Sequence, residues 1–120
     1  MQKLTAREED IMQEIWKLEK AFIRDVVDAM PKPKPHYNTV STIIKILEEK
    51  GFLAHEKFGK MYRYFPLISK DTYQQSAIGE VVQNYFDNSY LNIVTYFAKK
   101  EKISEEELKA ILDLIKNQKK

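Results

Sequence analysis

The chain has 120 residues, 43% of them hydrophobic and 32% charged, which suits one mainly helical globular domain that folds without cross-links. It has no cysteine and only 3 glycines. This excludes disulfides, thiolate metal sites and cysteine nucleophiles, and it argues against a glycine-rich phosphate-binding loop. The net charge of +2 conceals a basic middle third, because residues 31–67 carry 7 basic and 3 acidic side chains, as expected where a polyanion is contacted. No apolar segment is long enough to span a membrane and the acidic N-terminus is unlike a signal peptide, so we expect a cytoplasmic protein without membrane insertion.

The first predicted helix covers residues 5–18. Thr5 and Glu8 have the spacing of a capping box, in which each side chain accepts a hydrogen bond from the other residue's backbone N–H. Apolar side chains recur at helical spacing at Ile11, Met12, Ile15 and Leu18. The connector at residues 19–22 is long enough for a single β-bridge.

A second, shorter helix is predicted over residues 23–30. It ends before Pro31, because a residue that precedes proline is disfavoured in the helical conformation. Three prolines then alternate with two lysines over residues 31–35, a pattern typical of stiff, extended backbone. This segment is therefore expected to be a spacer between two helices.

The clearest helical pattern lies at residues 38–50. Asn38 is a candidate N-cap, and Gly51 stands where a C-terminal capping glycine belongs. One stripe of the helix is apolar and consists of Val40, Ile43, Ile44 and Leu47. At about 100° per residue, the opposite face carries Asn38, Thr42, Lys45 and Glu49, flanked by Thr39 and Ser41.

Short hydrogen-bonding side chains with a lysine on one helix face are typical of a surface that contacts base edges and phosphates of DNA. The helix N-terminus also offers free N–H groups to a phosphate. His36 beside it is either a phosphate contact or an idle loop residue. The alternative is a solvated polar face on an ordinary amphipathic helix.

A β-hairpin is predicted next, from strands Leu53–Phe58 and Met61–Pro66 joined by Gly59 and Lys60. This register places Glu56 opposite Arg63, a favourable pair of charges. A helix-turn-helix followed by a hairpin is the outline of a winged helix.

The predicted hairpin tip is basic, with Lys57 and Lys60 beside it. Such side chains contact the DNA backbone in a wing, where charge fixes position without reading sequence. The alternative is that these lysines only prevent edge-to-edge pairing of strands. Tyr62 and Tyr64 share one face of the hairpin, and we expect both to pack on the core.

Three further helices are predicted over residues 71–118. Ser104 and Glu107 form a second capping box at the start of the last helix. The apolar stripe of that helix, which we expect at the centre of a dimer contact, consists of Leu108, Ile111, Leu112 and Ile115. The aromatic residues of this part are expected to serve packing and dimer contact, and a small-ligand pocket is the alternative.

Catalytic and metal-binding constellations are not visible in the sequence. His36 and His55 are the only histidines and do not have the spacing of a metal site. We therefore expect no metal, no cofactor and no enzymatic activity.

The ordered set of motifs resembles the penicillinase-repressor family of bacterial winged-helix regulators, which includes methicillin-resistance and copper-transport repressors. Residues 4–16 resemble its first helix, residues 38–51 its recognition helix, residues 59–66 its wing, and the segment from Ser104 its last dimerisation helix. The resemblance implies a homodimer that represses transcription from a two-fold symmetric operator, often with TACA/TGTA half-sites. It also implies relief of repression through a sensor-protease or an antirepressor.

Two residue positions and one missing motif depart from the pattern of that family. The family often has arginine where this chain has Ile46. Its antibiotic-responsive members are cleaved between Asn and Phe in the fifth helix, and the matching bond here is Tyr96-Phe97. Its copper-responsive members use a C-terminal Cys-x-Cys pair, which a chain without cysteine cannot have.

The sequence therefore predicts a mainly α fold with a small β-hairpin. Residues 1–67 are expected to be the winged-helix DNA-binding domain, and residues 68–120 a helical dimerisation region. The rival function is a winged helix that serves as a protein-interaction module. Such modules often lose the basic wing and the polar recognition face, and this chain keeps both.

Overall fold

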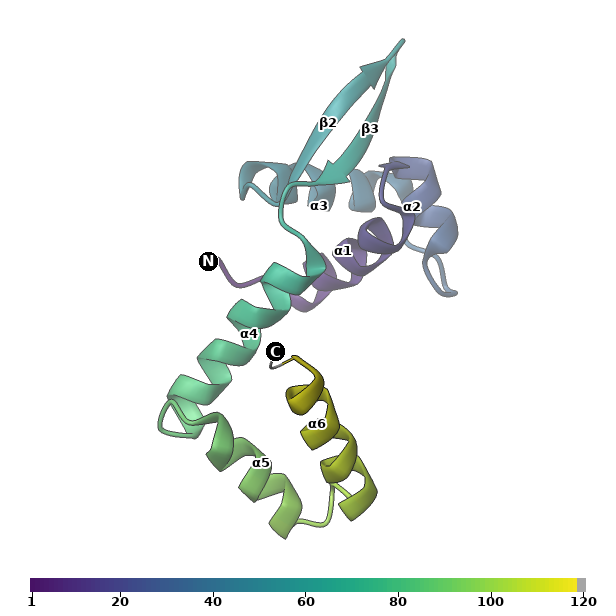
Figure 1. Cartoon of the computed structure of the whole chain (residues 1–120). Helices are drawn as coiled ribbons and strands as arrows, with labels where there is room; N and C mark the ends of the chain where they lie inside the picture. The colour runs from purple at the N-terminus through teal and green to yellow at the C-terminus, as the bar shows by residue number, and fades with distance from the viewer. Residues whose placement is uncertain (119–120) are drawn as a thin grey trace. The chain divides into compact units, whose positions relative to one another are not determined.

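The computed structural model describes residues 1–118 and divides into two compact units, Met1–Ala77 and Ile78–Lys120. We call them the first and the second unit (Figure 1). The helices are α1 (Ala6–Leu18), α2 (Ile23–Ala29), α3 (Tyr37–Glu49), α4 (Lys70–Tyr85), α5 (Tyr90–Lys99) and α6 (Glu105–Gln118). The strands are β1 (Ala21–Phe22), β2 (Leu53–Phe58) and β3 (Met61–Pro66). This mainly helical chain with a small sheet confirms the predicted fold class.

Helix α1 begins with the predicted capping box. The backbone N–H of Thr5 donates to Glu8 Oε1 at 2.8 Å, and the N–H of Glu8 donates to Thr5 Oγ1 at 3.2 Å. Helix α2 begins at Ile23, where the N–H of Phe22 donates to the Asp25 carboxylate at 2.9 Å. Both helices therefore start where a carboxylate satisfies an N–H group that has no partner within the helix.

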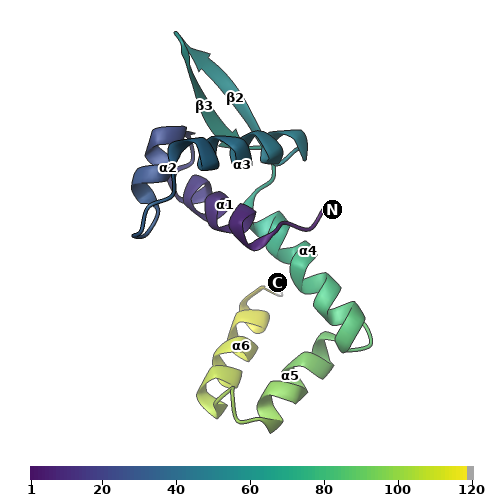
Figure 2. The same ribbon diagram turned by 180° about the vertical axis from the view of Figure 1, so that it is seen from behind.

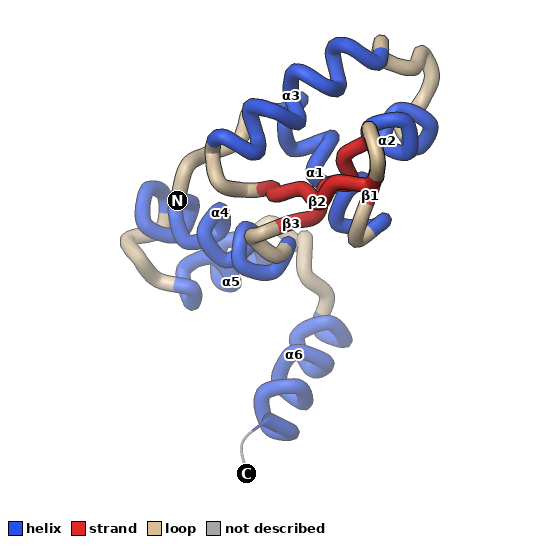
Figure 3. Tube along the Cα trace, turned by 90° about the horizontal axis from the view of Figure 1, so that it is seen from above, coloured by secondary structure: helices blue, strands red, loops and turns tan. Residues whose placement is uncertain are grey.

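The sheet is antiparallel with the strand order β1-β3-β2, and Figure 3 shows its strands side by side. The predicted register is confirmed, because Glu56 lies opposite Arg63 and accepts a hydrogen bond of 3.0 Å from Arg63 Nη2. Gly59 begins the turn with a φ of 60°, in the left-handed region that glycine adopts without strain. The expected β-bridge is strand β1, which pairs Ala21 with Tyr64.

The core of the first unit lies between α1, α2, α3 and the base of the hairpin. Tyr64 and Phe52 are the largest buried side chains, and they close the core on the side of the sheet. Figure 2 shows the hairpin projecting beyond α1, α2 and α3. The remaining core residues include Ile11, Met12, Ile15, Val26, Val40, Ile44, Leu47 and Leu53.

The second unit has little core of its own. Among its described residues only Val82 is buried, while Ile78 on the same helix is 50% exposed. Helix α6 begins with the predicted capping box, in which the Ser104 N–H donates to Glu107 Oε1 and the Glu107 N–H donates to Ser104 Oγ, both at 3.0 Å. The helices are thus well formed, but their apolar faces are largely uncovered.

The boundary between the two units falls within α4, after Ala77, which is further along the chain than the predicted boundary at residues 67/68. The roles of DNA binding and dimerisation, which the sequence assigns to the two parts, stay predictions. Within residues 1–118, no helix combines the length and the apolar character that crossing a membrane requires.

Candidate nucleic-acid interface

Helix α3 presents the predicted polar face to solvent. Asn38, Thr42 and Lys45 are exposed, while Thr39 and Ser41 are half-buried at its margins. The opposite stripe is anchored in the core, because Val40, Ile44 and Leu47 are fully buried. Amphipathic spacing therefore leaves the short polar side chains free to meet a partner.

The start of α3 differs from the prediction by one residue. His36 is the N-cap, with extended backbone and no capping hydrogen bond from its side chain, and Tyr37 is the first helical residue. The expectation that Asn38 caps the helix is wrong, because the extended backbone of the proline segment ends at His36 and the helix begins directly after it. Asn38 instead lies in the first turn, on the exposed face.

The hydroxyl of Thr42 donates to the backbone oxygen of Asn38 at 2.9 Å. Its proton is therefore used within the helix. The hydroxyl oxygen retains lone pairs and the side chain retains its methyl group, so Thr42 can still accept a hydrogen bond or contact a thymine methyl.

The end of α3 is fixed by a glycine motif. Gly51 has a φ of 83°, its N–H donates to the Glu48 oxygen, and the N–H of Phe52 donates to the Leu47 oxygen, both at 3.0 Å. This is the Schellman pattern, and the buried ring of Phe52 completes it. The predicted capping role of Gly51 is confirmed.

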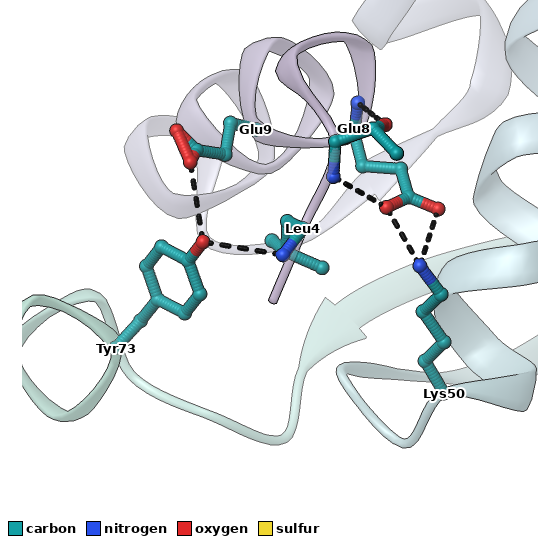
Figure 4. Close-up of polar contacts among 6 residues, drawn as sticks. Leu4, Glu8, Glu9, Lys50 and Tyr73 are labelled. Atoms are coloured by element: carbon teal, nitrogen blue, oxygen red, sulfur yellow. Dashed lines mark hydrogen bonds and ion pairs between the residues drawn. The ribbon is translucent and has the colours of Figure 1, made fainter. Parts of the chain in front are cut away.

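An ion pair joins the end of α3 to the start of α1. Lys50 Nζ lies 2.8 Å from Glu8 Oε1 and 2.9 Å from Glu8 Oε2, and Glu8 is only 6% exposed (Figure 4). Burial raises the pKa of Glu8, but the hydrogen bonds from Lys50 and Thr5 outweigh it and hold the pKa below its ordinary value. The pair thus fixes the position of α3 along α1.

Arg24 on α2 and Tyr37 at the start of α3 form a pair that the sequence pattern does not predict. The guanidinium of Arg24 on α2 lies 5.1 Å from the centre of the Tyr37 ring, and Tyr37 is 42% exposed. An exposed cation and an aromatic ring beside the polar face suit a phosphate and a sugar or base. Sequence spacing could not reveal them, because the pairing arises only when α2 packs against α3.

Lys34 is used within the fold. Its ammonium donates to the backbone oxygens of Asp28 at 2.6 Å and Met30 at 2.9 Å, at the C-terminus of α2. A cation there is stabilised by the partial negative charge of the helix end. The basic excess of the middle third is therefore only partly available to a partner.

The wing keeps its basic side chains free. Lys57 and Lys60 are exposed, and among the described residues neither they nor Lys45 form an ion pair. By contrast, Arg63 and Lys20 both bind Glu56 at 3.0 Å, and they hold the pKa of that carboxyl below its ordinary value. The cations nearest the wing tip are thus the unpaired ones.

The expectation for the hairpin tyrosines is half wrong. Tyr64 is 2% exposed in the core, but Tyr62 is 44% exposed and lies against His55, with ring centres 4.5 Å apart. The hairpin extends past the helices, so a side chain near its tip has no core beneath it. Phe58 and Met61 are exposed at the tip for the same reason.

A shallow hollow of about 120 Å³ brings the wing tip and the start of α3 together. Tyr37 contributes from α3, and Lys60 contributes from the turn. Its other lining residues are Phe22, Ile23, Met61 and Tyr62. The first residue of α3 and the tip of the wing therefore line the same hollow.

The residues predicted to dimerise lie in α6. Leu108 is half-buried, whereas Ile111, Leu112 and Ile115 are 42%, 50% and 46% exposed. The bond between Tyr96 and Phe97, predicted as a cleavage site, lies in the second half of α5. Both of these side chains are exposed, and their ring centres are 5.3 Å apart.

Within residues 1–118, no group of three or more histidine and carboxylate side chains is placed to hold a metal ion. His55 is paired with Glu48, and His36 lies exposed at the start of α3.

The chain is similar to a known family of proteins. The profile of the penicillinase repressor family matches residues 4–117. The methicillin resistance regulatory protein MecI of Staphylococcus aureus (strain N315) is 20% identical over 114 residues, which cover 94% of this chain and 93% of that protein. The penicillinase repressor of Bacillus licheniformis is 24% identical over 122 residues, which cover 98% and 95%.

Among solved structures, the solution structure of the DNA binding domain of the repressor BlaI is 28% identical. It superposes with a TM-score of 0.52 and covers 61% of this chain and 94% of that domain. The chain therefore belongs to the penicillinase repressor family, a family of winged-helix, DNA-binding transcriptional repressors.

Proposed function

We propose that the chain represses transcription as a homodimer that binds a palindromic operator, with one first unit on each half-site. The observation that carries this proposal is the exposed face of short polar side chains on α3, together with Lys45, Lys57 and Lys60, which are exposed and form no ion pair among the described residues. Asn38, Thr39, Ser41, Thr42 and Lys45 would contact the major groove, and Lys57 and Lys60 the backbone beside it. Such a protein acts in the cytoplasm.

The uncovered apolar stripe of α6 supports the homodimer. Ile111, Leu112 and Ile115 expose much of their surface in the single chain, and burying such a stripe against a two-fold copy is favourable. A dimer also explains the need for two half-sites, since one module reads only a few base pairs. Binding of the second half-site then becomes intramolecular and gains effective concentration.

The controlled genes would be antibiotic-resistance or stress genes, and the names of two relatives support the first of these. One is a methicillin resistance regulatory protein and the other a penicillinase repressor. Relief of repression would come from a sensor-protease or an antirepressor. For proteolysis, the Tyr96-Phe97 bond must leave its helix, because proteases bind extended backbone; α5 is a short helix of 10 residues that can unfold locally.

The rival function, a protein-interaction module, is less well supported. A surface for protein partners does not need unpaired lysines beside a face of short hydrogen-bonding side chains. Retention on heparin at low salt, lost at moderate salt, would distinguish the two, because counterion release is characteristic of polyanion binding.

Selection from random duplexes with the purified full chain tests the proposal. We expect an enriched inverted repeat, with half-sites related to TACA/TGTA and centres about one DNA turn apart, roughly 34–36 Å. Sedimentation of the complex should give two chains per duplex. No enrichment, or enrichment of a single asymmetric site by one chain, would contradict the proposal.

Relief of repression is tested separately by mass spectrometry of the protein from induced cells. A fragment ending at Tyr96 supports proteolysis. An intact chain during full derepression excludes it and leaves an antirepressor or another route.

A further inference from the structure

The first turns of α4 are attached to α1 by polar contacts. The hydroxyl of Tyr73 donates to Glu9 Oε2 at 3.1 Å, and its oxygen accepts from the backbone N–H of Leu4 at 3.4 Å (Figure 4). Because one bond ends on a carboxylate, it belongs to the stronger class of hydrogen bonds. Tyr73 therefore connects the first turns of α4 both to Leu4, which precedes α1, and to Glu9 in the first turn of α1.

The ring of Tyr73 lies between two other aromatic rings. Its centre is 5.9 Å from that of Trp16 on α1 and 5.8 Å from that of Phe52, which follows α3. These separations are within the range of favourable aromatic pairs. The ring thus fixes the base of α4 laterally, while the hydroxyl fixes it along α1.

The backbone that leads into α4 is held as well. The N–H of Leu67 donates to the Phe52 oxygen at 2.8 Å, and the indole N–H of Trp16 donates to the Ile68 oxygen at 3.0 Å. Ser69 then caps the helix through the N–H of Thr72 at 3.1 Å. The chain therefore has no loose linker between β3 and α4.

Helix α4 continues unbroken through 16 residues, from Lys70 to Tyr85, and the first unit ends at Ala77. Gly79 lies two residues beyond Ala77 and is the only one of the chain's three glycines inside a helix. Glycine weakens a helix interior, because it has the largest conformational freedom to lose. The helix is thus fixed at its base and softened just beyond the first unit.

We propose that Tyr73 is a positioning residue that fixes the direction in which α4 leaves the first unit, and thereby sets which half-site spacing the dimer accepts. This rests on the proposed function, a dimer on two half-sites. One inserted base pair moves a half-site by about 3.4 Å and turns it by about 35°. If the direction of α4 is fixed, the dimer cannot adapt to this shift and rotation of the half-site, and it binds the altered spacing more weakly. If α4 is loosely attached, the dimer can adapt, and its preference for one spacing is lost.

The contacts of Tyr73 favour a role in half-site spacing rather than in recognition of base sequence. Its named partners, Glu9, Leu4, Trp16 and Phe52, lie neither on the exposed face of α3 nor on the wing. Removal of the hydroxyl alone keeps the ring in its aromatic contacts, so the first unit stays folded.

The test compares the full-length wild type with Tyr73→Phe on three duplexes. These carry the selected operator, the same operator with one base pair inserted between the half-sites, and a single half-site. We expect equal affinity for the single half-site and an unchanged dimer. The penalty for the inserted base pair should fall about tenfold, the factor for one hydrogen bond to a charged group. An unchanged penalty, or equal weakening on all three duplexes, would overturn the proposal.

Two matched variants sharpen the result. Tyr85→Phe removes a hydroxyl from the same helix at a side chain that is 77% exposed, and it should behave as wild type. Gly79→Ala should raise the penalty, because alanine stiffens the helix and its Cβ meets no atom within 4 Å in this chain. If Gly79→Ala and Tyr73→Phe shift the penalty in the same direction, the proposal fails.

A failure of the proposed function is recognised by a different outcome. A wild type that binds none of the three duplexes contradicts operator binding itself. A wild type that binds the operator and the inserted duplex equally well overturns only the role of Tyr73.

Discussion

Thr42 lies on the exposed face of α3, with its hydroxyl proton bound to the oxygen of Asn38. The hydroxyl oxygen and the methyl group are therefore what it can present to a base. We expect Thr42→Ala to weaken binding to the selected operator by about 1–3 kcal/mol and to relax sequence preference at one position. Gel shifts on operators varied base by base measure this effect.

Two substitutions separate the groups of Thr42. Thr42→Val keeps a methyl group and Thr42→Ser keeps the hydroxyl, so the one that retains affinity identifies the contact. Thr95→Ala, at an exposed threonine on α5, is the control and should leave binding unchanged. Full affinity in both Thr42→Ala and Thr42→Val would mean that the recognition surface lies elsewhere.

Lys60 has a different predicted role, since it stands exposed and unpaired at the wing turn among the described residues. Lys60→Ala should weaken binding to all duplexes alike and reduce the slope of log affinity against log salt by about one unit. Titrations at several salt concentrations provide the slope. Lys102→Ala, at an exposed lysine of the second unit, should leave it unchanged; a sequence-dependent loss at Lys60 would contradict a backbone contact.

The Glu8–Lys50 pair links stability to pH. Since the pKa of Glu8 is lowered from 4.5 by folding, its contribution is fully present above about pH 4.5 and is lost as the pH falls through the lower folded value. Glu8→Gln should cost about 2 kcal/mol near neutral pH, less than a fully buried pair because Lys50 is partly exposed. Below the folded pKa the cost should shrink.

Urea unfolding at about pH 7 and in the acid range well below the ordinary pKa of Glu8 measures that difference. Glu80→Gln, at an exposed carboxylate of α4 without an ion pair among the described residues, is the control. An equal loss of stability for Glu8→Gln at both pH values would show that shape or capping, not charge, is what Glu8 supplies.

At the scale of elements, local signals predicted α3 and the hairpin well. A sustained apolar stripe, a glycine after the helix and a short turn between alternating strands all depend on neighbouring residues. Helix α3 begins one residue before the predicted start. The reason is that the extended backbone of the proline segment, rather than the Asn38 side chain, determines where the helix begins.

Contacts between distant elements could not be predicted in the same way. The pairing of Arg24 with Tyr37 and the seat of Tyr73 between Trp16 and Phe52 depend on tertiary packing. The prediction for Tyr62 is wrong because strand alternation indicates which face a side chain occupies, but not how far the core extends beneath that face. The contacts with DNA, the dimer contact and the cleavage site stay predictions.

The glycines of two elements should respond to alanine with opposite signs. Gly51 has a φ of 83°, so Gly51→Ala should destabilise the first unit by about 1 kcal/mol or more. Gly79 lies inside α4 with free space for a methyl group, so Gly79→Ala should stabilise the helix by about 0.5–1 kcal/mol. Thermal unfolding measures both; a stabilising Gly51→Ala would mean that the end of α3 is not fixed by its backbone.

At the scale of the whole molecule, the contrast between a well-packed first unit and a second unit with uncovered apolar faces leads to a prediction about assembly. Replacing Ile111 and Ile115 together with lysine should give a folded monomer that binds a single half-site as wild type does. Its affinity for the full operator should fall about 10²–10⁴-fold, because the gain from effective concentration is lost.

Sedimentation and gel shifts on the same sample test both parts of this prediction. A chain ending at Ala77, which keeps Tyr73 and the whole first unit, should behave like the double variant. Lysine at the exposed Leu114 instead is the control, because that side chain is outside the predicted stripe. A double variant that stays dimeric and binds at full strength would show that α6 is not the dimer contact.

Trp16 is the only tryptophan of the chain, and it stands at the base of α4, bonded to the Ile68 oxygen and beside the ring of Tyr73. The emission wavelength of an indole depends on the polarity around it, and Trp16 is half-buried against the core. The protein therefore carries an intrinsic optical reporter of whether α4 is seated on α1. Release of that helix would appear as a red shift of the fluorescence in the unlabelled chain, and it could be followed on DNA, which contributes almost no light in that range.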